Sequence, residues 1–386
     1  MNKVYLDNAA TTQLDRRVLD AMLPYFTDFF GNASTLYAEG TQAKESLEKF
    51  RSKLAGFINA QNDEIIFTSG GTEANNLALK GIAFANRSKG NHIIVSAIEH
   101  DCILNTCKWL ETQGFFITYL PVDENGFVDL EKLSRFINPK TILVSVMHAN
   151  NEIGTIQPIS NIGKLCKERD VYFHTDACQT FGKIPIDVVS QDISLMTMNA
   201  HKMYGPKGVG GLYVKKGINI TPLLHGGGQE FGLRSTTENI AGIAGFVKAA
   251  ELCMKEMEIE SKRLSTLTNK LTQILQRRFE GFYVNGSLNH RLPNNLNFGI
   301  SGLEGETIKL LLFLDEKGIA VSTGSACSNN DTTKSASHVL QAIGKDPFEA
   351  RGAIRLGLGR FNTENDIDYF AETLTTIIKQ LKPIFS

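Results

Sequence analysis

The chain has 386 residues, of which 42% are hydrophobic and 21% are charged. This length is enough to bury a large core, and it favours two domains. The formal net charge of −1 argues against a nucleic-acid partner held by bulk electrostatic attraction. No run of residues approaches the roughly 20 apolar residues that a membrane span needs. We therefore expect no direct nucleic-acid binding and no membrane partner.

The N-terminus and the cysteines both favour a cytoplasmic protein. Residues 1–7 contain no apolar stretch of the kind found in secretory signals. The cysteines lack a short repeated C-x-x-C spacing, which argues against a zinc ribbon and a disulfide framework. They are Cys102, Cys107, Cys166, Cys178, Cys253 and Cys327. We expect reduced thiols and a cytoplasmic location.

Along most of the chain, buried-looking strands alternate with amphipathic helices. An extended start at residues 5–12 precedes expected helices at 18–26 and 43–58. Strands are then expected at 65–68, 92–96, 116–120, 141–147, 172–175 and 193–197, with helices at 73–85, 102–110 and 162–169. This alternation predicts an α/β fold with a mostly parallel sheet covered on both faces. Residues 208–214 are a further strand and a candidate for an antiparallel edge.

The C-terminal third predicts a smaller α+β unit. A long helical stretch from residue 240 to about 279 could bridge two domains. Strands are expected at 295–298 and 319–322, and helices at 306–314, 337–343 and 365–381. The polar segment 329–337 predicts a mobile loop. We expect a large domain at 15–257, and a small domain built from 1–14 and 258–386 that carries a loop at about 324–337.

A lysine and an acid at two strand ends carry the first chemical signal. Lys202 follows the expected strand at 193–197, and Asp176 follows the strand at 172–175. A lone loop lysine is usually only solvated. A lysine that forms a Schiff base, with an acid that keeps a pyridine nitrogen protonated, is the minimal protein equipment for pyridoxal phosphate. The pair predicts that cofactor.

Other strand ends carry candidate ligands for the same cofactor. Gly71 and Thr72 lie between a strand and a helix, where free N–H groups favour a phosphate, and Asn199 and His201 could add donors. His100 could stack on a ring or move protons, although a hydrogen-bonded surface histidine is the alternative.

Two asparagines follow the strand at 141–147. Asn150 and Asn151 could bind a ring hydroxyl or a substrate carboxylate, and an Asx turn would explain one of them.

One cysteine and one arginine complete the set of candidates. Cys327 stands among small polar residues, so accessible thiolate chemistry is plausible, whereas Cys102, Cys107 and Cys166 lie in helical patterns that favour core packing. Arg355 is flanked by apolar residues and needs an anion, which a substrate carboxylate or an internal salt bridge would provide.

Together these motifs resemble the NifS/IscS-type cysteine desulfurases of the class-V aminotransferase family. These enzymes have the fold-type I, aspartate-aminotransferase-like fold and depend on pyridoxal phosphate. The matching motifs run nearly end to end and lie at residues 5–12, 68–76, 99–100, 150–154, 175–179, 201–208, 225–230, 234–237, 324–327 and 355–360.

The resemblance implies a role for each matching residue. Lys202 would form the Schiff base, Asp176 would pair with the pyridine nitrogen, and His100 would stack on the ring. Gln179 would contact the ring hydroxyl. The implied phosphate contacts are Gly71, Thr72, Asn199 and His201. Thr237 would contact the phosphate bound in a neighbouring subunit, which implies a homodimer with shared active sites. Asn151 and Arg355 would orient the substrate carboxylate.

The implied reaction converts L-cysteine to L-alanine and leaves the sulfur on Cys327 as a persulfide. Its acceptor would be an iron–sulfur scaffold protein or a tRNA-thiolation enzyme. A transient iron–sulfur ligand role for Cys327 stays open. The alternatives are a selenocysteine lyase or a cysteine sulfinate desulfinase of the same fold, and a scaffold-docking protein without a primary catalytic role. An aminotransferase would not need Cys327.

The sequence departs from the family pattern in two places. Asn199 stands where the family usually has serine, and its amide can still donate to a phosphate. The segment between Cys327 and His338 is about two residues longer than in the commonest members. Its length resembles the subclass with a long loop, so the departure concerns the sulfur acceptor rather than the chemistry.

Overall fold

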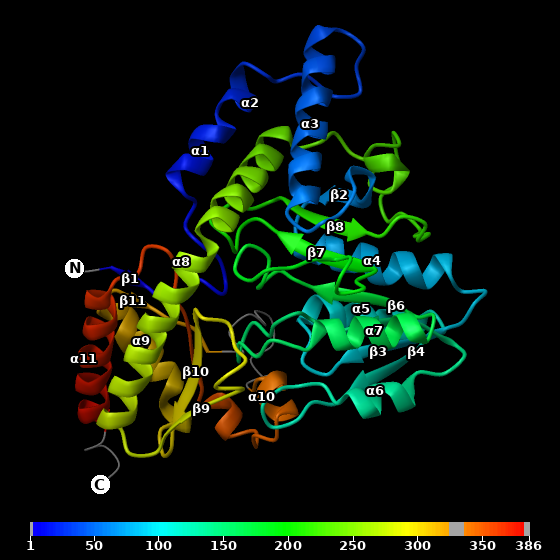
Figure 1. The fold of residues 1–386 in the computed structure, drawn as a ribbon. Coiled ribbons are helices and arrows are strands. Elements are labelled where there is room, and N and C mark those ends of the chain that lie inside the picture. The colour runs from blue at the N-terminus through cyan, green and yellow to red at the C-terminus, as the bar shows by residue number, and fades with distance from the viewer. Residues whose placement is uncertain (1–2, 324–335, 382–386) are drawn as a thin grey trace.

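The computed structural model describes residues 3–323 and 336–381, where the strands form sheets of seven, three and two strands. The large sheet has the order β2-β8-β7-β6-β5-β3-β4 (Figure 1). Its strands are β2 (Ile65–Thr68), β3 (His92–Ser96), β4 (Phe116–Leu120), β5 (Thr141–Ser145), β6 (Tyr172–Asp176), β7 (Leu195–Asn199) and β8 (Gly210–Val214).

The large sheet is parallel except for β8, which runs antiparallel to both of its neighbours. The predicted direction of this strand is confirmed, but its predicted place at the edge is wrong, because β8 lies between β2 and β7. All five of its residues are buried, as an interior strand requires. A Cβ on Gly210 would lie 2.8 Å from the Cα of Gly70, so this strand needs glycine where β2 ends.

Helices cover both faces of the large sheet. Alternate strand residues point to opposite faces, so Ile93 and Val95 pack in one core and Ile94 packs in the other. The first core contains α4 (Gly71–Ala85) and α5 (Asp101–Thr112). The second contains α3 (Ala38–Gly56), α6 (Leu130–Phe136), α7 (Ile159–Glu168) and the first part of α8 (Ile240–Arg278). The expected two-sided cover is confirmed.

The two small sheets and the last helices form a separate core. β9 (Phe282–Val284), β10 (Asn295–Ile300) and β12 (Ile354–Gly357) pair antiparallel, and β1 (Val4–Tyr5) pairs parallel with β11 (Ile319–Ala320). The helices are α9 (Thr307–Glu316), α10 (His338–Ala342) and α11 (Glu364–Leu381). The start of the chain therefore packs with its C-terminal part.

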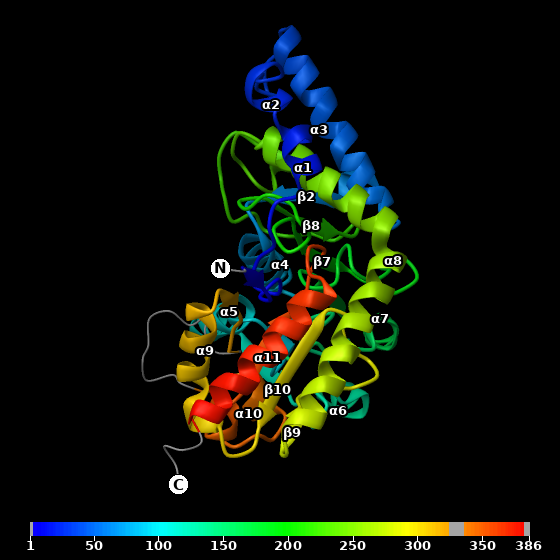
Figure 2. The same ribbon diagram turned by 90° about the vertical axis from the view of Figure 1, so that its left-hand side faces the viewer.

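Helix α8 joins the two parts of the molecule. It has 39 residues and runs from α1 and α3 at one end to β9, β10 and α11 at the other (Figure 2). Ile243 and Phe246 pack against the large sheet, whereas Leu267 and Leu271 pack in the core of the small sheets. The domain division at residues 14/15 and 257/258 stays a proposal. Within the described ranges, no helix has the length and apolar character to cross a membrane.

Some predicted elements differ in their bounds. The single helix expected at 18–26 is two helices, α1 (Arg16–Met22) and α2 (Pro24–Thr27), because proline cannot continue the hydrogen-bonding of the first. Helix α6 and strand β9 were not predicted, since seven and three residues give too short a pattern. Short 3₁₀ helices lie at η1 (Asn62–Glu64), η2 (Glu230–Gly232), η3 (Glu304–Glu306) and η4 (Glu349–Arg351).

Candidate active site

The predicted site residues meet at the carboxyl ends of the parallel strands. Asp176 is the last residue of β6, and Lys202 lies three residues beyond the end of the neighbouring strand β7. His100 follows β3 as the N-cap of α5, and Gly71 follows β2 as the first residue of α4. Ligands of open α/β sheets bind at this edge.

Asp176 is a buried carboxylate that the surrounding chain keeps ionised. Its Oδ1 accepts a 2.8 Å hydrogen bond from the Cys178 backbone N–H, and its Oδ2 accepts a 2.7 Å bond from the Asn75 amide. Burial by itself raises the pKa of Asp176, but these donors and the positive charge of Lys202 outweigh it and hold the pKa below its usual value. A buried acid of this kind can hold a proton on a basic nitrogen.

A second buried carboxyl lies close to Asp176, and its pKa is shifted in the opposite direction. Burial, followed by repulsion from Asp176, raises the pKa of Glu99 well above its usual value. One of its oxygens accepts a 2.6 Å hydrogen bond from the Met147 backbone N–H. Glu99 therefore takes up a proton more readily than an ordinary carboxyl, whereas Asp176 keeps its charge more readily.

His100 is held as a neutral ring. Burial and then the charge of Lys202 lower its pKa. Its Nδ1 accepts a 3.2 Å hydrogen bond from the Cys102 backbone N–H, and the Cys102 Sγ lies 3.1 Å from the same atom. The residue is half-buried and its ring is hydrogen-bonded at Nδ1, and its role at a cofactor stays a prediction.

Hydrogen bonds from the N-terminal segment hold the turn that carries Lys202. The Thr12 hydroxyl donates to the His201 carbonyl at 2.8 Å and accepts from the Tyr204 backbone N–H at 2.7 Å. The His201 Nδ1 lies 3.1 Å from the Thr11 hydroxyl. Tyr204 has a φ of 65°, a left-handed conformation that needs such support. These threonines belong to the matched motif at 5–12, but their contacts were not predicted.

Gly71 and Asn199 form one end of the site. A Cβ on Gly71 would lie 2.7 Å from the Cys178 Sγ and 3.5 Å from the Asn199 amide nitrogen, so only glycine fits there. Asn199 is 4% exposed, and its Oδ1 has no partner among the described residues. Thr72 is exposed in the first turn of α4. The free N–H groups of that turn and the small residues leave a cradle suited to a phosphate.

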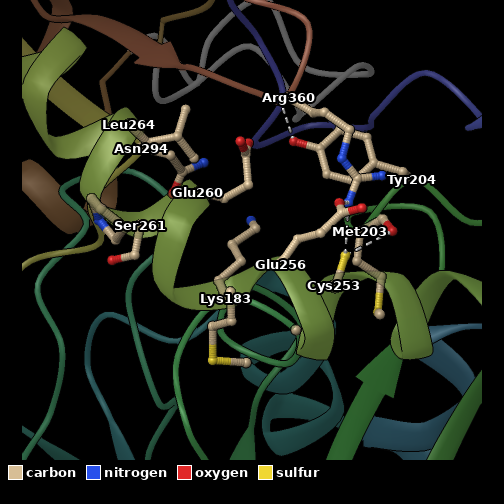
Figure 3. A pocket seen from close by; sticks show the side chains of 13 residues that line it. Lys183, Met203, Tyr204, Cys253, Glu256, Glu260, Ser261, Leu264, Asn294 and Arg360 are labelled. Carbon is tan, nitrogen blue, oxygen red and sulfur yellow. Dashed lines mark hydrogen bonds and ion pairs between the residues drawn. The ribbon is translucent and has the colours of Figure 1, made fainter.

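Gln179 contacts the N-terminal segment and Lys183, which lines a cavity of about 40 Å³. Its amide nitrogen donates to the Ala9 carbonyl at 2.9 Å, and the Lys183 amine lies 3.5 Å from its Oε1. Figure 3 shows this amine pointing into the cavity, which Tyr204 and Arg360 also line. Burial, followed by the charge of Lys202, lowers the pKa of Lys183 to about 8. Lys183 was not predicted as a neighbour of the site.

Arg355 links β12 to the edge of the large sheet. Its guanidinium donates to Asp7 Oδ1 at 2.8 Å and to the Asn151 carbonyl at 3.4 Å. The side chain is 2% exposed, and its Nε has no partner within the described ranges. The internal salt bridge considered from the sequence is therefore present, and Nε is left as a donor for a further anion.

The two asparagines after β5 have different tasks. Asn150 Oδ1 accepts from the backbone N–H groups of Glu152 and Ile153 at 2.8 and 3.0 Å, which is the Asx turn that the sequence left open. Among the described residues, no hydrogen bond is formed by the Asn151 side chain, so this amide is the one available to a ligand.

Among the predicted residues that the structure describes, Thr237 is not brought into this cluster. Thr237 is exposed in the segment before α8, and it makes no hydrogen bond to the other site residues in the described part of the chain. Cys327 lies outside the described residues. Cys107 and Cys166 are buried in the cores as expected, whereas Cys102 also touches the site. Within residues 3–323 and 336–381, no three potential metal ligands gather.

The residues present fit pyridoxal phosphate. Asp176 can face a protonated ring nitrogen, the Gly71 cradle can take the phosphate, and Arg355 Nε can take a carboxylate. Asn75 and Cys102 belong to the same cluster but were missed by sequence reasoning. The amide of Asn75 on an otherwise apolar face of α4 was a signal that could have identified it.

Comparisons with known proteins agree on one family for this chain. A family model described as aminotransferase class-V matches residues 4–370. A relative from Clostridium botulinum, named cysteine desulfurase IscS, is 53% identical over 383 residues, which span 98% of this chain and 96% of the relative. A relative of the same name from Dictyoglomus turgidum is 50% identical over 382 residues, spanning 99% and 96%.

The solved structures extend the agreement to three dimensions. A structure titled NifS-like protein has a TM-score of 0.91 and 39% identity, covering 98% of this chain and 100% of that one. The NifS-like protein from Rickettsia africae has a TM-score of 0.88 and 33% identity, covering 98% and 100%. The fold-type I architecture with its mostly parallel sheet is confirmed. The chain belongs to the class-V aminotransferase family, among its NifS/IscS-type cysteine desulfurases.

Proposed function

We propose that this cysteine desulfurase converts L-cysteine to L-alanine with pyridoxal phosphate bound at the strand ends. The observation that carries the proposal is Asp176, a buried carboxylate held ionised close to Lys202. Within the described part of the chain, Asp176 pairs with no arginine, so its charge is available to a ligand. Family members depend on this cofactor in general, which supports the same assignment here.

Pyridoxal phosphate, when bound, supplies an electron sink for charge that develops at the substrate's α-carbon. Asp176 would hold the proton on the ring nitrogen, and the Lys202 amine would take a proton from the substrate and return it. His100 would stack on the ring, and Gln179 would donate to the ring hydroxyl. The phosphate would be held by Gly71, Thr72, Asn199 and His201, with Thr237 contributed by the second subunit of a homodimer.

Substrate binding and sulfur transfer use the remaining residues. Arg355 and Asn151 would bind the carboxylate of L-cysteine, through Nε and the side-chain amide. The thiolate of Cys327 attacks the substrate sulfur, so that an S–S bond forms and the Cβ–S bond breaks with its electron pair left on carbon. Cysteine and the enzyme thiol thereby become alanine and an enzyme persulfide, without an external oxidant. The role of Cys327 rests on the matched motif at 324–327.

The proposed partners follow from the persulfide. It would pass to an iron–sulfur scaffold protein or a tRNA-thiolation enzyme, and Cys327 would act as an iron–sulfur ligand only transiently during transfer. We place the protein in the cytoplasm, since this chemistry needs reduced thiols and the five cysteines of the described ranges are free.

The proposal is tested by alanine and sulfide release from L-cysteine in the presence of a reducing thiol. We expect activity in the wild type and its collapse in Cys327→Ser, with pyridoxal phosphate still bound. Lys202→Ala should lose the visible absorbance of the bound cofactor. Full-rate alanine release by Cys327→Ser would overturn the persulfide role, and unchanged absorbance in Lys202→Ala would overturn the cofactor assignment.

A further inference from the structure

A chain of polar contacts runs from Asp176 to His100 through two residues that have no role in the reaction above. Asn75, on α4, donates from its amide nitrogen to Asp176 Oδ2 at 2.7 Å. The same nitrogen lies 3.2 Å from the Sγ of Cys102, in the first turn of α5. That sulfur lies 3.1 Å from His100 Nδ1. The contacts therefore connect the ends of β6 and β3 across two helices.

The donors and acceptors along this chain can be assigned. An amide nitrogen has two hydrogens, so Asn75 can donate one to Asp176 and one to the Cys102 sulfur. Burial, followed by repulsion from Asp176, raises the pKa of Cys102 to about 12, so the thiol keeps its hydrogen at neutral pH. Among the described residues, His100 Nδ1 is the acceptor within reach of this S–H, and it also accepts the Cys102 backbone N–H at 3.2 Å. With Nδ1 as an acceptor, a neutral ring carries its proton on Nε2.

We propose that Asn75 and Cys102 are positioning residues that hold His100 as its Nε2–H tautomer and tie its orientation to the Asp176 carboxylate. The proposal deepens the function above, because it rests on His100 acting at the cofactor. Its consequence is that the side of the ring away from the chain of contacts presents a proton donor. Ring and carboxylate are then oriented together, before any ligand arrives.

The substitutions that test the proposal leave the charges around His100 unchanged. Those charges come from Lys202, Asp176, Asp101 and His338. Cys102→Ala removes the thiol but keeps the backbone N–H of residue 102, and Cys102→Ser restores a hydroxyl that can accept and donate in the same place. Cys107→Ala is the matched control, since Cys107 is a buried cysteine of the same helix without a hydrogen bond to His100.

The readout is the His100 ring in nitrogen-15 NMR spectra of the full chain, with and without added pyridoxal phosphate. The signals are assigned by comparison with His100→Gln. We expect the Nε2–H tautomer in the wild type, and an approximately threefold stronger proton binding by His100 in Cys102→Ala, because a donor to the neutral ring is lost. Cys102→Ser and Cys107→Ala should titrate like the wild type.

A double-mutant cycle tests the role of Asn75. If the contacts form one chain, Asn75→Ala and Cys102→Ala together should change His100 titration by less than the sum of the single effects. Additive effects, an Nδ1–H tautomer in the wild type, or titration of Cys102→Ala identical to that of Cys107→Ala would each overturn the proposal. Failure to take up pyridoxal phosphate would instead overturn the cofactor site, while the spectra without cofactor still decide the tautomer.

Discussion

Asp176 and Glu230 are buried carboxylates of the large α/β part, and their negative charges are stabilised in different ways. Glu230 pairs with Arg51 through two hydrogen bonds of 2.7 and 2.8 Å, and the two side chains are 1% and 2% exposed. It also accepts the Phe67 backbone N–H at 2.7 Å. Asp176 has no arginine partner, and two neutral donors and the more distant Lys202 keep it ionised.

The difference separates a structural charge from one available for chemistry. The Arg51 guanidinium is further enclosed between the rings of Phe67 and Phe231, each centred 4.9 Å away. The Arg51–Glu230 pair, which we call the closed pair, links α3 and β2 to the η2 turn. Because Glu230 is paired with Arg51, its negative charge is not available to a ligand. At Asp176 the charge is stabilised but not neutralised by a direct ion pair. A buried carboxylate without a direct ion pair is thus a better candidate for a functional group than one that is paired.

The largest effect is expected from Asp176→Asn. An amide cannot hold a proton on the ring nitrogen through a charge, so we expect alanine release to fall about 1000-fold. The midpoint of urea unfolding should change less than in Glu230→Gln, because no ion pair is broken and Asn75 can turn its Oδ1, unpaired within the described ranges, toward the new amide. A loss of stability with activity per folded molecule retained would show that Asp176 is structural, like Glu230.

Glu230→Gln should have the converse result. It leaves the buried Arg51 charge with the more exposed Glu48 carboxylate, 3.2 Å from Nε, in place of its buried partner. We therefore expect the free energy of unfolding to fall by about 3 kcal/mol while the folded protein still releases alanine. Urea unfolding and activity below the transition measure the two effects. Adding Arg51→Met should recover part of the lost stability. No recovery in the double variant would contradict the closed-pair account.

A smaller effect is expected from Arg355→Lys. One terminal nitrogen of the Arg355 guanidinium pairs with Asp7, whereas Nε has no partner among the described residues. The lysine keeps the charge near Asp7 but loses the Nε donor, so we expect the KM for L-cysteine to rise about tenfold with a smaller change in kcat. Steady-state kinetics of alanine release measure both constants. An unchanged KM would mean that Asp7 uses the whole guanidinium and that the substrate carboxylate binds elsewhere.

The smallest effect is expected from His174, which lies on the same strand as Asp176 and makes the free energy of unfolding depend on pH. Burial lowers the pKa of His174 to about 4, from 6.5 in the unfolded chain. Between these values the unfolded chain binds the proton and the folded protein does not. The stabilisation present above pH 6.5 is therefore lost as pH falls toward 4, by about 1 kcal/mol from pH 6.5 to 5.5.

His174→Gln should make this pH dependence less steep without abolishing it, because burial lowers the pKa values of His148 and His201 to about 4 as well. The amide can keep the hydrogen bonds to Ser145 and Thr197, which are 2.8 and 3.1 Å long at the histidine. Urea unfolding at pH 7.5, 6.5 and 5.5 compares the two proteins. Asp176 contributes no loss over this range, because its pKa lies below its usual value of 3.8. An equal slope in the variant would show that another group titrates.

Much of the cluster was predictable because its residues occupy strand ends. The alternation of strands and helices predicted the parallel sheet, and parallel strands bring Asp176, Lys202 and His100 to one edge whatever their separation in sequence. The motif matches then supplied the family, the reaction and the role expected of each residue. The small polar neighbours of Cys327 made thiolate chemistry plausible, and the motif match added the persulfide role.

Only the tertiary structure decided how these groups are charged and connected. The place of β8 inside the sheet, the pairing of Arg355 with Asp7, and the contacts of Asn75 and Cys102 join residues that lie far apart in the chain. Local sequence carries residue type and periodicity, but protonation depends on burial and on neighbours that come from other elements. The sequence therefore determined which chemistry this protein contains. The packing of its strands and helices decided which carboxylate stays ionised, which takes up a proton more readily, and which is paired with an arginine.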